Sequence, residues 1–247
     1  MYLKNIISSL IPNNLLRFWS LFRSEQILKK LKKNNKILNV GDLDKYEITL
    51  TCIPENTWNM TLFEVAIICL FSKLINAINV FEIGTFDGRT ALNLACCLPQ
   101  NGKVTTINLP KDHLGGNEKI CSQGVGYRYK SRREAERIEQ LIGDSMTFEI
   151  DSFKNKYDIV IIDGDHTEKY VNNDTQLALK LLKKRKHSLI VWHDIDRPEI
   201  YKALNEIERT MDFKYHYIAH TRIGLAFPFA GDEIPIKFSS TTANPRT

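Results

Sequence analysis

The sequence predicts an α/β protein built on a doubly wound, mostly parallel sheet of seven strands with an antiparallel hairpin at its C-terminal end. Short continuous apolar runs alternate with helix-length segments between residues 79 and 209, which is the pattern of parallel strands covered by helices on both faces. The last two apolar runs are separated only by Thr221 and Arg222. So short a link cannot cross over the sheet, and it therefore predicts an antiparallel pair.

Each element is expected from the length and spacing of its apolar residues. The expected strands are Asn79–Ile83, Lys103–Leu109, Ile138–Ile142, Tyr157–Asp163, Ser188–Trp192, Lys214–His220 and Ile223–Phe227. The expected helices are Asn59–Ala77, Thr90–Cys97, Glu168–Leu182 and Arg197–Arg209.

We expect three parts in the chain: a basic helical extension over residues 1–58, a main α/β domain over residues 59–236 and a flexible tail over residues 237–247. Residues 1–38 have apolar residues at the spacing of two amphipathic helices broken near Pro12. Such a stripe usually packs on the body of the protein or on a second subunit, and we expect a homo-oligomer. A peripheral contact with an anionic membrane surface is the alternative.

Composition limits the class of protein. The 247 residues are 43% hydrophobic and 26% charged, as in an ordinary globular protein, and the formal net charge is +5. Residues 1–40 contain eight basic side chains and one acidic side chain, a local charge of +7, so the remainder carries −2. A slightly acidic body does not favour nucleic acid as a partner.

Cysteine usage and hydropathy indicate the compartment. The five cysteines include no C-x-x-C motif, which favours a reduced, cytoplasmic protein. No apolar run approaches the roughly 18 residues of a membrane span, and no secretory cleavage signal is expected at the N-terminus.

The most informative segment is the strand, turn and helix that begin at Val80 and read VFEIGTFDGRT. Gly84 and Gly88 let the backbone approach a ligand at the carboxyl edge of the sheet, which predicts a nucleotide site. The dinucleotide fingerprint G-x-G-x-x-G is not met, and Asp87 would repel a pyrophosphate. Glu82 and Asp87 instead favour a cofactor with a positive part, such as S-adenosylmethionine (SAM): a carboxylate and an ammonium about 4 Å apart attract by roughly 4 kcal/mol at an effective dielectric of about 20.

The pattern E-x-G-x-x-x-G-x-T resembles motif I of the class I SAM-dependent methyltransferases, which have a Rossmann-like fold. Together with IDGDH at residues 162–166 and VWHD at residues 191–194, it resembles a bacterial subfamily related to metal-dependent macrolide-sugar O-methyltransferases and cephalosporin hydroxylase-like proteins. The similarity extends from about Met60 to Phe227.

The resemblance implies a set of cofactor-binding positions. The turn would surround the methionine end of SAM, Asn108 would face the ribose in place of the family's acid, and the segment after the third strand would contact adenine. The implied residues are Glu82, Gly84, Thr85, Phe86, Asp87, Gly88, Thr90, Asn108, Asp144, Ser145 and Asp163.

Acids and histidines end the fourth and fifth strands, at Asp163 and His166 and at His193 and Asp194. They should meet at the same edge as the turn and could hold a divalent cation. The resemblance implies Asp163, His193 and Asp194 as ligands of magnesium, with His166 as the catalytic base beside Asp163. Because the relatives have an acid where His193 stands, manganese, iron or zinc, or no metal at all, remain open.

These expectations point to a cytoplasmic SAM-dependent O-methyltransferase that modifies a hydroxyl of a small acceptor. A sugar, free or phosphorylated or nucleotide-linked, of a surface glycan or a secondary metabolite is the expected acceptor. A metal-dependent hydroxylase of the cephalosporin type and a noncatalytic SAM-binding scaffold are the alternatives.

Overall fold

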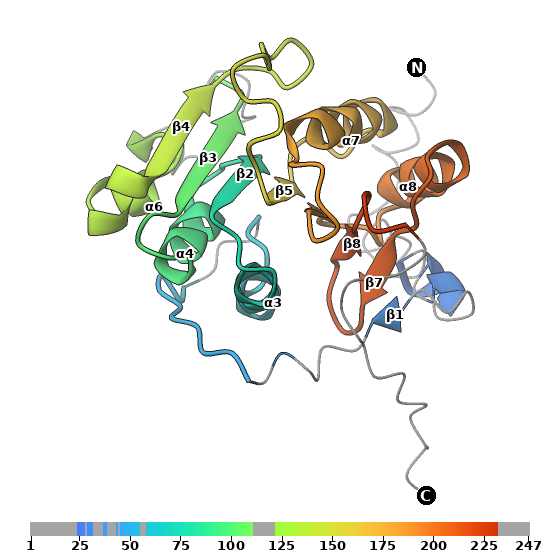
Figure 1. Cartoon of the computed structure of the whole chain (residues 1–247), viewed down its shortest axis with the longest axis horizontal. Coiled ribbons are helices and arrows are strands. Elements are labelled where there is room, and N and C mark those ends of the chain that lie inside the picture. Colours follow the sequence, from blue (N-terminus) through green and yellow to red (C-terminus); the bar gives the residue numbers. More distant parts are fainter. Residues whose placement is uncertain are drawn as a thin grey trace, which may run out of the picture.

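The computed structural model describes residues 24–27, 29–31, 37–38, 43, 45–54, 58–110 and 122–231. Within these ranges, eight strands form one sheet in the order β1-β7-β8-β6-β5-β2-β3-β4 (Figure 1). The strands are β1 Ile37–Leu38, β2 Asn79–Ile83, β3 Lys103–Asn108, β4 Ile138–Ile142, β5 Ile159–Ile162, β6 Leu189–Trp192, β7 His216–Ile218 and β8 Gly224–Ala226. All neighbouring strands are parallel except that β8 runs antiparallel to both β6 and β7.

The predicted fold class is confirmed. All seven expected strands are present, and β2 and β4 have the expected bounds. The eighth strand, β1, comes from the end of the segment that we expected to be helical, and it pairs in parallel with β7 at the edge of the sheet. A strand of two residues has no periodicity that a sequence pattern could reveal.

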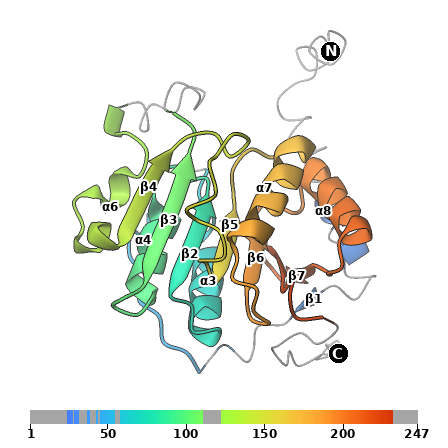
Figure 2. The same cartoon turned by 45° about the horizontal axis from the view of Figure 1, so that its top comes forward.

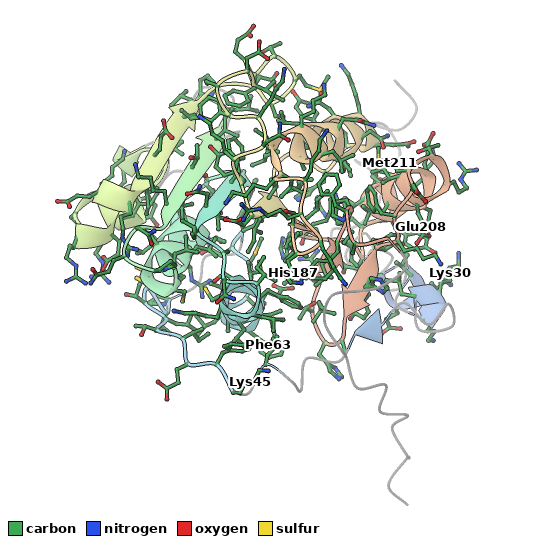
Figure 3. All side chains as sticks on the ribbon, viewed as in Figure 1. Lys30, Lys45, Phe63, His187, Glu208 and Met211 are labelled. Atoms are coloured by element: carbon green, nitrogen blue, oxygen red, sulfur yellow. The ribbon has the colours of Figure 1, made fainter. Side chains whose placement is uncertain are left out.

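Helices cover both faces of the sheet, as Figures 1 and 2 show. α3 (Leu62–Leu74) and α4 (Arg89–Cys97) pack on one face, and α7 (Glu168–Leu181) and α8 (Pro198–Thr210) pack on the other. Successive strand residues point to opposite faces, so Val80 joins the first core and Phe81 joins the second. Side chains fill the space between the helices and the sheet (Figure 3).

The outer edge near β4 carries two short elements, the helix α6 (Tyr127–Lys130) and the 3-10 helix η3 (Arg133–Arg137). Both lie against α4. They follow residues 111–121, which are outside the described ranges.

Part of the N-terminal extension packs on the body. The described residues of 24–31 are helical, and Ile27 and Leu31 are buried in the core beneath α7 and α8. Residues 1–23, which include most of the two expected helices, and the expected tail over residues 237–247 lie outside the described residues. Within the described part of the chain, no helix is long and apolar enough to cross a bilayer.

Candidate functional site

A cavity of about 660 Å³ opens at the carboxyl ends of β2, β3, β5 and β6. This is the edge at which open α/β sheets bind ligands, and the volume is in the range of small-molecule sites. Of the predicted site residues, those in the cavity wall are Gly84, Phe86, Asn108, Asp144, Ser145, Asp163, His166, His193 and Asp194. The predicted residues outside the wall are Glu82, Thr85, Asp87, Gly88 and Thr90.

The turn after β2 requires its two glycines. Gly84 has φ +104°, and a Cβ there would lie 2.1 Å from the backbone oxygen of Asp163. Gly88 has φ +85° and begins α4, and a Cβ there would lie 2.5 Å from the Tyr129 ring. Only glycine adopts these angles without strain and leaves the turn this close to β5. The backbone of Gly84 therefore forms the cavity wall between β2 and β5.

Glu82 lies below the turn rather than in the cavity. Its side chain is buried, and it accepts a hydrogen bond of 2.7 Å from Thr106 Oγ1, which also lies 2.7 Å from Thr85 Oγ1. Burial raises the pKa of Glu82 to about 8, and the nearby charges of Asp163 and Asp87 act in the same direction against the Thr106 hydrogen bond. Glu82 is therefore mostly neutral at pH 7, and it supports the turn through a chain of hydroxyl groups.

Asp87 is also turned away from the cavity. It is 1% exposed, and its carboxylate pairs with Arg128 Nε at 2.7 Å and accepts from the backbone N–H of Arg89 and from Asn59 Nδ2, both at 3.0 Å. The negative charge that we assigned to the cofactor is thus paired within the protein. Acidic residues do surround the cavity, but those that line it in the described part of the chain are Asp144, Asp163, Asp165, Asp174 and Asp194.

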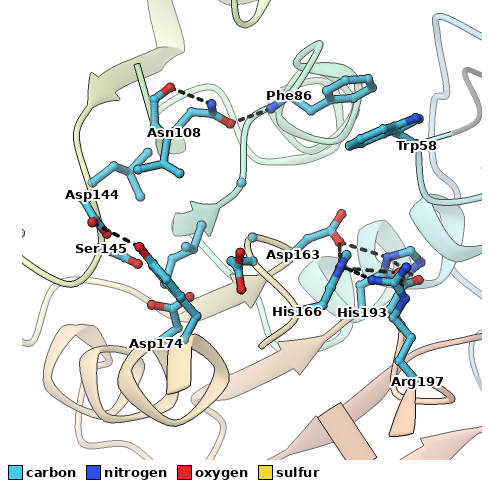
Figure 4. Close-up of a pocket in the computed structure, with 18 of the residues that line it drawn as sticks. Trp58, Phe86, Asn108, Asp144, Ser145, Asp163, His166, Asp174, His193 and Arg197 are labelled. Atoms are coloured by element: carbon cyan, nitrogen blue, oxygen red, sulfur yellow. Dashed lines mark hydrogen bonds and ion pairs between the residues drawn. The ribbon is translucent and has the colours of Figure 1, made fainter. Parts of the chain in front are cut away.

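Asn108 and Asp144 hold the walls at the end of the cavity that we expected to bind ribose and adenine (Figure 4). Asn108 Oδ1 accepts from the Phe86 N–H at 3.0 Å, and its Nδ2 donates to the Leu109 oxygen at 2.9 Å. Asp144 accepts from the Met146 N–H at 2.9 Å and from the Tyr170 hydroxyl at 3.1 Å. Asn108 thus connects the end of β3 to the loop after β2, and Asp144 connects the loop after β4 to α7. Both connections lie in the wall of the cavity.

At the other end, the predicted acids and histidines do meet (Figure 4). His193 Nδ1 lies 3.0 Å from Asp163 Oδ1 and 3.1 Å from Asp194 Oδ1. His166 Nε2 lies 3.4 Å from Asp194 Oδ2 and 4.0 Å from Asp163 Oδ1. The convergence of the two strand ends is the expected one.

Glu64 completes this cluster. Thr61 and Glu64 form a capping box at the start of α3: the Thr61 hydroxyl accepts from the Glu64 N–H, and Glu64 Oε2 accepts from the Thr61 N–H at 2.8 Å. The same carboxylate lies 3.4 Å from His193 Nε2 and accepts from the Arg222 N–H at 2.6 Å. The T-x-x-E pattern at residues 61–64 signals the cap, but nothing in it signals His193.

The charges of the cluster support one another. Burial opposes the ionisation of Glu64, yet the hydrogen bond and charge of His193 and the N–H groups of Thr61 and Arg222 lower its pKa to about 2. Burial likewise opposes a charged His193, but Asp163, Glu64 and Asp194 raise its pKa well above the ordinary value. His193 is therefore an imidazolium held between three carboxylates.

Arg197 sets the tautomer of His166. An Arg197 Nη1 group donates to His166 Nδ1. A guanidinium can only donate, so the neutral ring carries its proton on Nε2, which faces Asp194. Arg197 is 46% exposed in its side chain and lines the same cavity. Its contact with His166 connects the start of α8 to the loop after β5. No sequence motif predicts this contact.

The three predicted metal ligands do not fit a bound divalent cation in this arrangement. The ring nitrogen of His193 occupies the space between Asp163 and Asp194, and Arg222 Nη1 lies 2.9 Å from Asp194 Oδ1. Among the described residues, no group of three or more His, Cys, Asp or Glu side chains could hold a metal ion. The geometry is that of a hydrogen-bonded ion cluster.

An aromatic pair borders the cavity beside this cluster. The rings of Trp58 and Phe86 stack with centroids 6.1 Å apart and planes at 19°. Trp58 remains 67% exposed, which is unusual for a large apolar side chain. Its open ring face is available to a flat or sugar-like ligand.

Comparisons with known proteins agree with this fold. Residues 81–195 match a family described as a methyltransferase domain. The Tapetum-specific methyltransferase 1 of Arabidopsis thaliana is 28% identical over 177 residues, which cover 70% of this chain and 64% of that protein. The caffeoyl-CoA O-methyltransferase 3 of Nicotiana tabacum is 28% identical over 127 residues, half of each chain. The chain thus spans about half to two thirds of the length of these relatives.

A solved structure gives the same fold. The O-methyltransferase from Bacillus cereus in complex with S-adenosylhomocysteine (SAH) superposes with a TM-score of 0.52 at 17% identity, covering 91% of this chain and 96% of that one.

Proposed function

We propose that this chain, whose residues 81–195 match a methyltransferase-domain family, is a class I SAM-dependent enzyme that transfers the methyl group of SAM to a hydroxyl of a small acceptor. One observation carries the proposal: the glycine turn at Gly84, the Asp163 carboxylate next to it and the His166 ring line a single cavity. A methyl donor held by the turn would present its sulfonium toward an acceptor beside His166.

The carboxylates of the wall favour a cationic donor. Asp163 remains ionised, because His193 and His166 lower its pKa against the effect of burial. An ionised Asp163 at the strand end next to Gly84 attracts the sulfonium and the ammonium of SAM. This role replaces the one that we expected for Glu82 and Asp87. The Gly84 backbone, Asn108 and the Asp144–Ser145 segment would hold the rest of the cofactor.

We assign the proton of the acceptor hydroxyl to His166. The acceptor oxygen attacks the methyl carbon, the carbon–sulfur bond breaks with its electron pair remaining on sulfur, and SAH leaves as a neutral thioether. Arg197 blocks His166 Nδ1 in the present arrangement, so the acceptor must draw Arg197 away before Nδ1 can take the proton. Asp194, 3.4 Å from Nε2, then stabilises the imidazolium.

A sugar ring is the acceptor that we propose. The open face of Trp58 supports it, because the C–H groups of a sugar pack well on an indole ring. Arg197 and Arg222, both near half exposure in the cavity wall, would favour a sugar that carries a phosphate. Trp58 and the two arginines would also accept an aromatic diol. Aromatic diols should therefore be assayed beside sugars as methyl acceptors.

Metal assistance would require His193 to leave the space between Asp163 and Asp194. We therefore propose transfer by the chain's own residues, and chelation tests it. Methyl transfer that persists in excess EDTA supports the proposal. Loss of activity in EDTA that Mg²⁺ or Mn²⁺ restores would instead return Asp163, His193 and Asp194 to the role of metal ligands.

Four further assignments belong to this proposal. We place the protein in the cytoplasm, because Cys52, Cys69, Cys96 and Cys97 are free thiols. We place the domain boundary near residue 59, before α3. The burial of Ile27 and Leu31 favours packing of the extension on protein rather than on lipid. Size-exclusion chromatography with light scattering tests the expected homo-oligomer.

The decisive experiment pairs binding with turnover. Calorimetry should show SAH binding to the wild type and none to Gly84→Arg, with circular dichroism confirming that the variant is folded. Transfer of a labelled methyl group from SAM should then be measured on sugars, sugar phosphates and aromatic diols. His166→Ala should lower kcat by about 10²–10⁴-fold and leave SAH affinity unchanged.

Two outcomes favour the alternatives. Oxygen consumption without methyl transfer would indicate a hydroxylase. SAH affinity with no turnover on any acceptor, and no effect of His166→Ala, would indicate a binding scaffold. No SAH binding by the wild type would overturn the proposed function altogether.

A further inference from the structure

Asp174 is a buried acid in the cavity wall that neither the sequence motifs nor the proposed mechanism uses. It lies in α7, is fully buried, and lines the same cavity as Gly84 and Asp163. Its Oδ1 accepts a hydrogen bond of 3.0 Å from Asn173 Nδ2. Its Oδ2 is also buried but has no hydrogen-bond partner among the described residues. Buried polar atoms without a partner are rare, and they often mark the place of a ligand.

The surroundings of Asp174 place it at the end of the cavity opposite Trp58 (Figure 4). Asn173 Nδ2 donates to the Ser145 oxygen at 3.1 Å, so α7 is attached to the loop after β4 beside Asp174. A Cβ built on Gly164 would lie 3.7 Å from Asp174 Oδ2. Gly164 lines the same cavity, and because it has no side chain it places only backbone atoms beside the carboxyl group.

The carboxyl group is an acceptor of hydrogen bonds near neutral pH. Burial raises the pKa of Asp174 to about 6, and the charges of Asp144 and Asp165 act in the same direction, against hydrogen bonds from Ser145 and Asn173. At pH 7.5 most of the population is ionised and can only accept. A ligand that completes Oδ2 must therefore offer an N–H or O–H group.

We propose that Asp174 Oδ2 accepts a hydrogen bond from the exocyclic amino group of the adenine of SAM, and that Asp174 makes the site select adenine over a 6-oxopurine. The inference rests on the proposed function and adds a residue that determines cofactor specificity. With the methionine end at Gly84 and the ribose at Asn108, the base extends toward Ser145 and Asp174. A 6-oxopurine presents a carbonyl oxygen where adenine presents the amino group, and two acceptors repel each other.

The test uses two ligands that differ only at this group: SAH and S-inosylhomocysteine, its deaminated form. Calorimetry at pH 7.5 on the full chain should show that the wild type binds SAH about 10- to 150-fold more tightly, the usual range for a hydrogen bond to a charged group. In Asp174→Asn the amide can turn its NH₂ toward the carbonyl of the inosine form. The preference should then fall to near one or reverse.

A matched control removes a charge from the same helix away from the cavity. Glu168 lies in the first turn of α7 and pairs with Lys202 at 2.8 Å on the surface. Glu168→Gln should keep the wild-type ratio of the two affinities. A merely structural role of Asp174 would weaken both ligands equally in Asp174→Asn and leave the ratio unchanged, which would overturn the proposal.

If Asp174→Asn fails to fold, the affinities of the wild type for the two ligands still test the proposal. Equal affinity of the wild type for the two ligands would contradict selection by Asp174, while the proposed function would stand. Failure of the wild type to bind either ligand would remove the proposed function and this inference with it.

Discussion

Glu64 and Glu82 are both buried beside the cavity, yet they are in opposite states. The pKa of Glu64 is lowered to about 2, whereas that of Glu82 is raised to about 8. Burial opposes the charged form of both. Glu64 receives two backbone N–H groups and the imidazolium of His193, whereas Glu82 receives a hydrogen bond from Thr106 and has the acids Asp163 and Asp87 nearby.

The difference separates two layers of the site. The layer at the acceptor end is a charged cluster with a cation, His193, at its centre. The layer below the glycine turn is a neutral hydroxyl network that supports the backbone. A buried carboxylate keeps its charge only where cationic or N–H partners surround it, so a carboxylate near a turn in the sequence does not by itself show which charge the ligand meets.

The largest effect should come from removing the central cation. In His193→Leu the three carboxylates of Glu64, Asp163 and Asp194 face one another without it. We expect a loss of about 3–5 kcal/mol in the free energy of unfolding, measured by urea denaturation, because an uncompensated buried charge remains. Adding Glu64→Gln should recover part of the loss. A double variant no more stable than His193→Leu would mean that the pair is not coupled.

The pH dependence of Glu82 is the next test. Its pKa is about 8 in the folded protein and 4.5 ordinarily, so the folded state binds more protons and loses stability as the pH rises from about 4.5 to about 8. Glu82→Gln removes this dependence. The stability of the variant relative to the wild type should therefore rise with pH, by up to about 1.4 kcal/mol per pH unit. A difference that does not change over this window would contradict a neutral Glu82.

Glu64 should show the opposite trend. Its pKa is about 2 in the folded protein, so its charge stabilises the fold above pH 4.5, and that contribution is lost as the pH falls toward 2. The stability difference between the wild type and Glu64→Gln should be greatest above pH 4.5 and should shrink in acid. A difference that grows in acid would place Glu64 in the same class as Glu82.

A smaller loss of stability is expected when the ion pair between Arg128 and Asp87 is broken. This pair holds the Asp87 carboxylate away from the cavity. Arg128→Met leaves the Asp87 carboxylate buried with only its N–H donors. We expect a loss of about 1–3 kcal/mol in the free energy of unfolding, the usual cost of an unsatisfied buried group. SAH affinity should change little, because Arg128 does not line the cavity. A large change in affinity at unchanged stability would bring Asp87 back into cofactor binding.

The smallest effect sets the baseline. Lys154 and Asp151 form an exposed ion pair that is not part of the cluster. Lys154→Ala should leave the unfolding midpoint unchanged within error, because exposed pairs contribute little. A measurable loss of stability in Lys154→Ala would mean that the fold is sensitive to most substitutions. The losses in the other variants could then not be assigned to the contacts that they remove.

The sequence pattern was sufficient for the sheet and for part of the site. The bounds of β2, which is buried, and of β4, a partly exposed edge strand, were both predicted to the residue. Asp163, His166, His193 and Asp194 follow strands that end at one edge, so their meeting was predictable as well. The neutral state of Glu82 was not, because it depends on which neighbours enclose the side chain.

Other features depend on contacts between distant segments. Arg128 reaches Asp87 from 41 residues away, and Arg222 N–H reaches Glu64 from 158 residues away. Asp174 lies in the middle of a helix rather than at a strand end, so the rule that located the other acids does not apply to it. Such pairings arise only when the helices and the closing hairpin are packed on the sheet.

The strand β1 protects the protein from aggregation by covering the edge of β7. Without Ile37–Leu38, the backbone N–H and C=O groups on one side of β7 would be left as a free border, which readily recruits a strand from another molecule. We therefore expect a chain that starts after residue 40 to precipitate or to exchange strands between copies, even if it retains every group that faces the ligand. The segment that contains Ile37–Leu38 would then prevent self-association through the edge of β7.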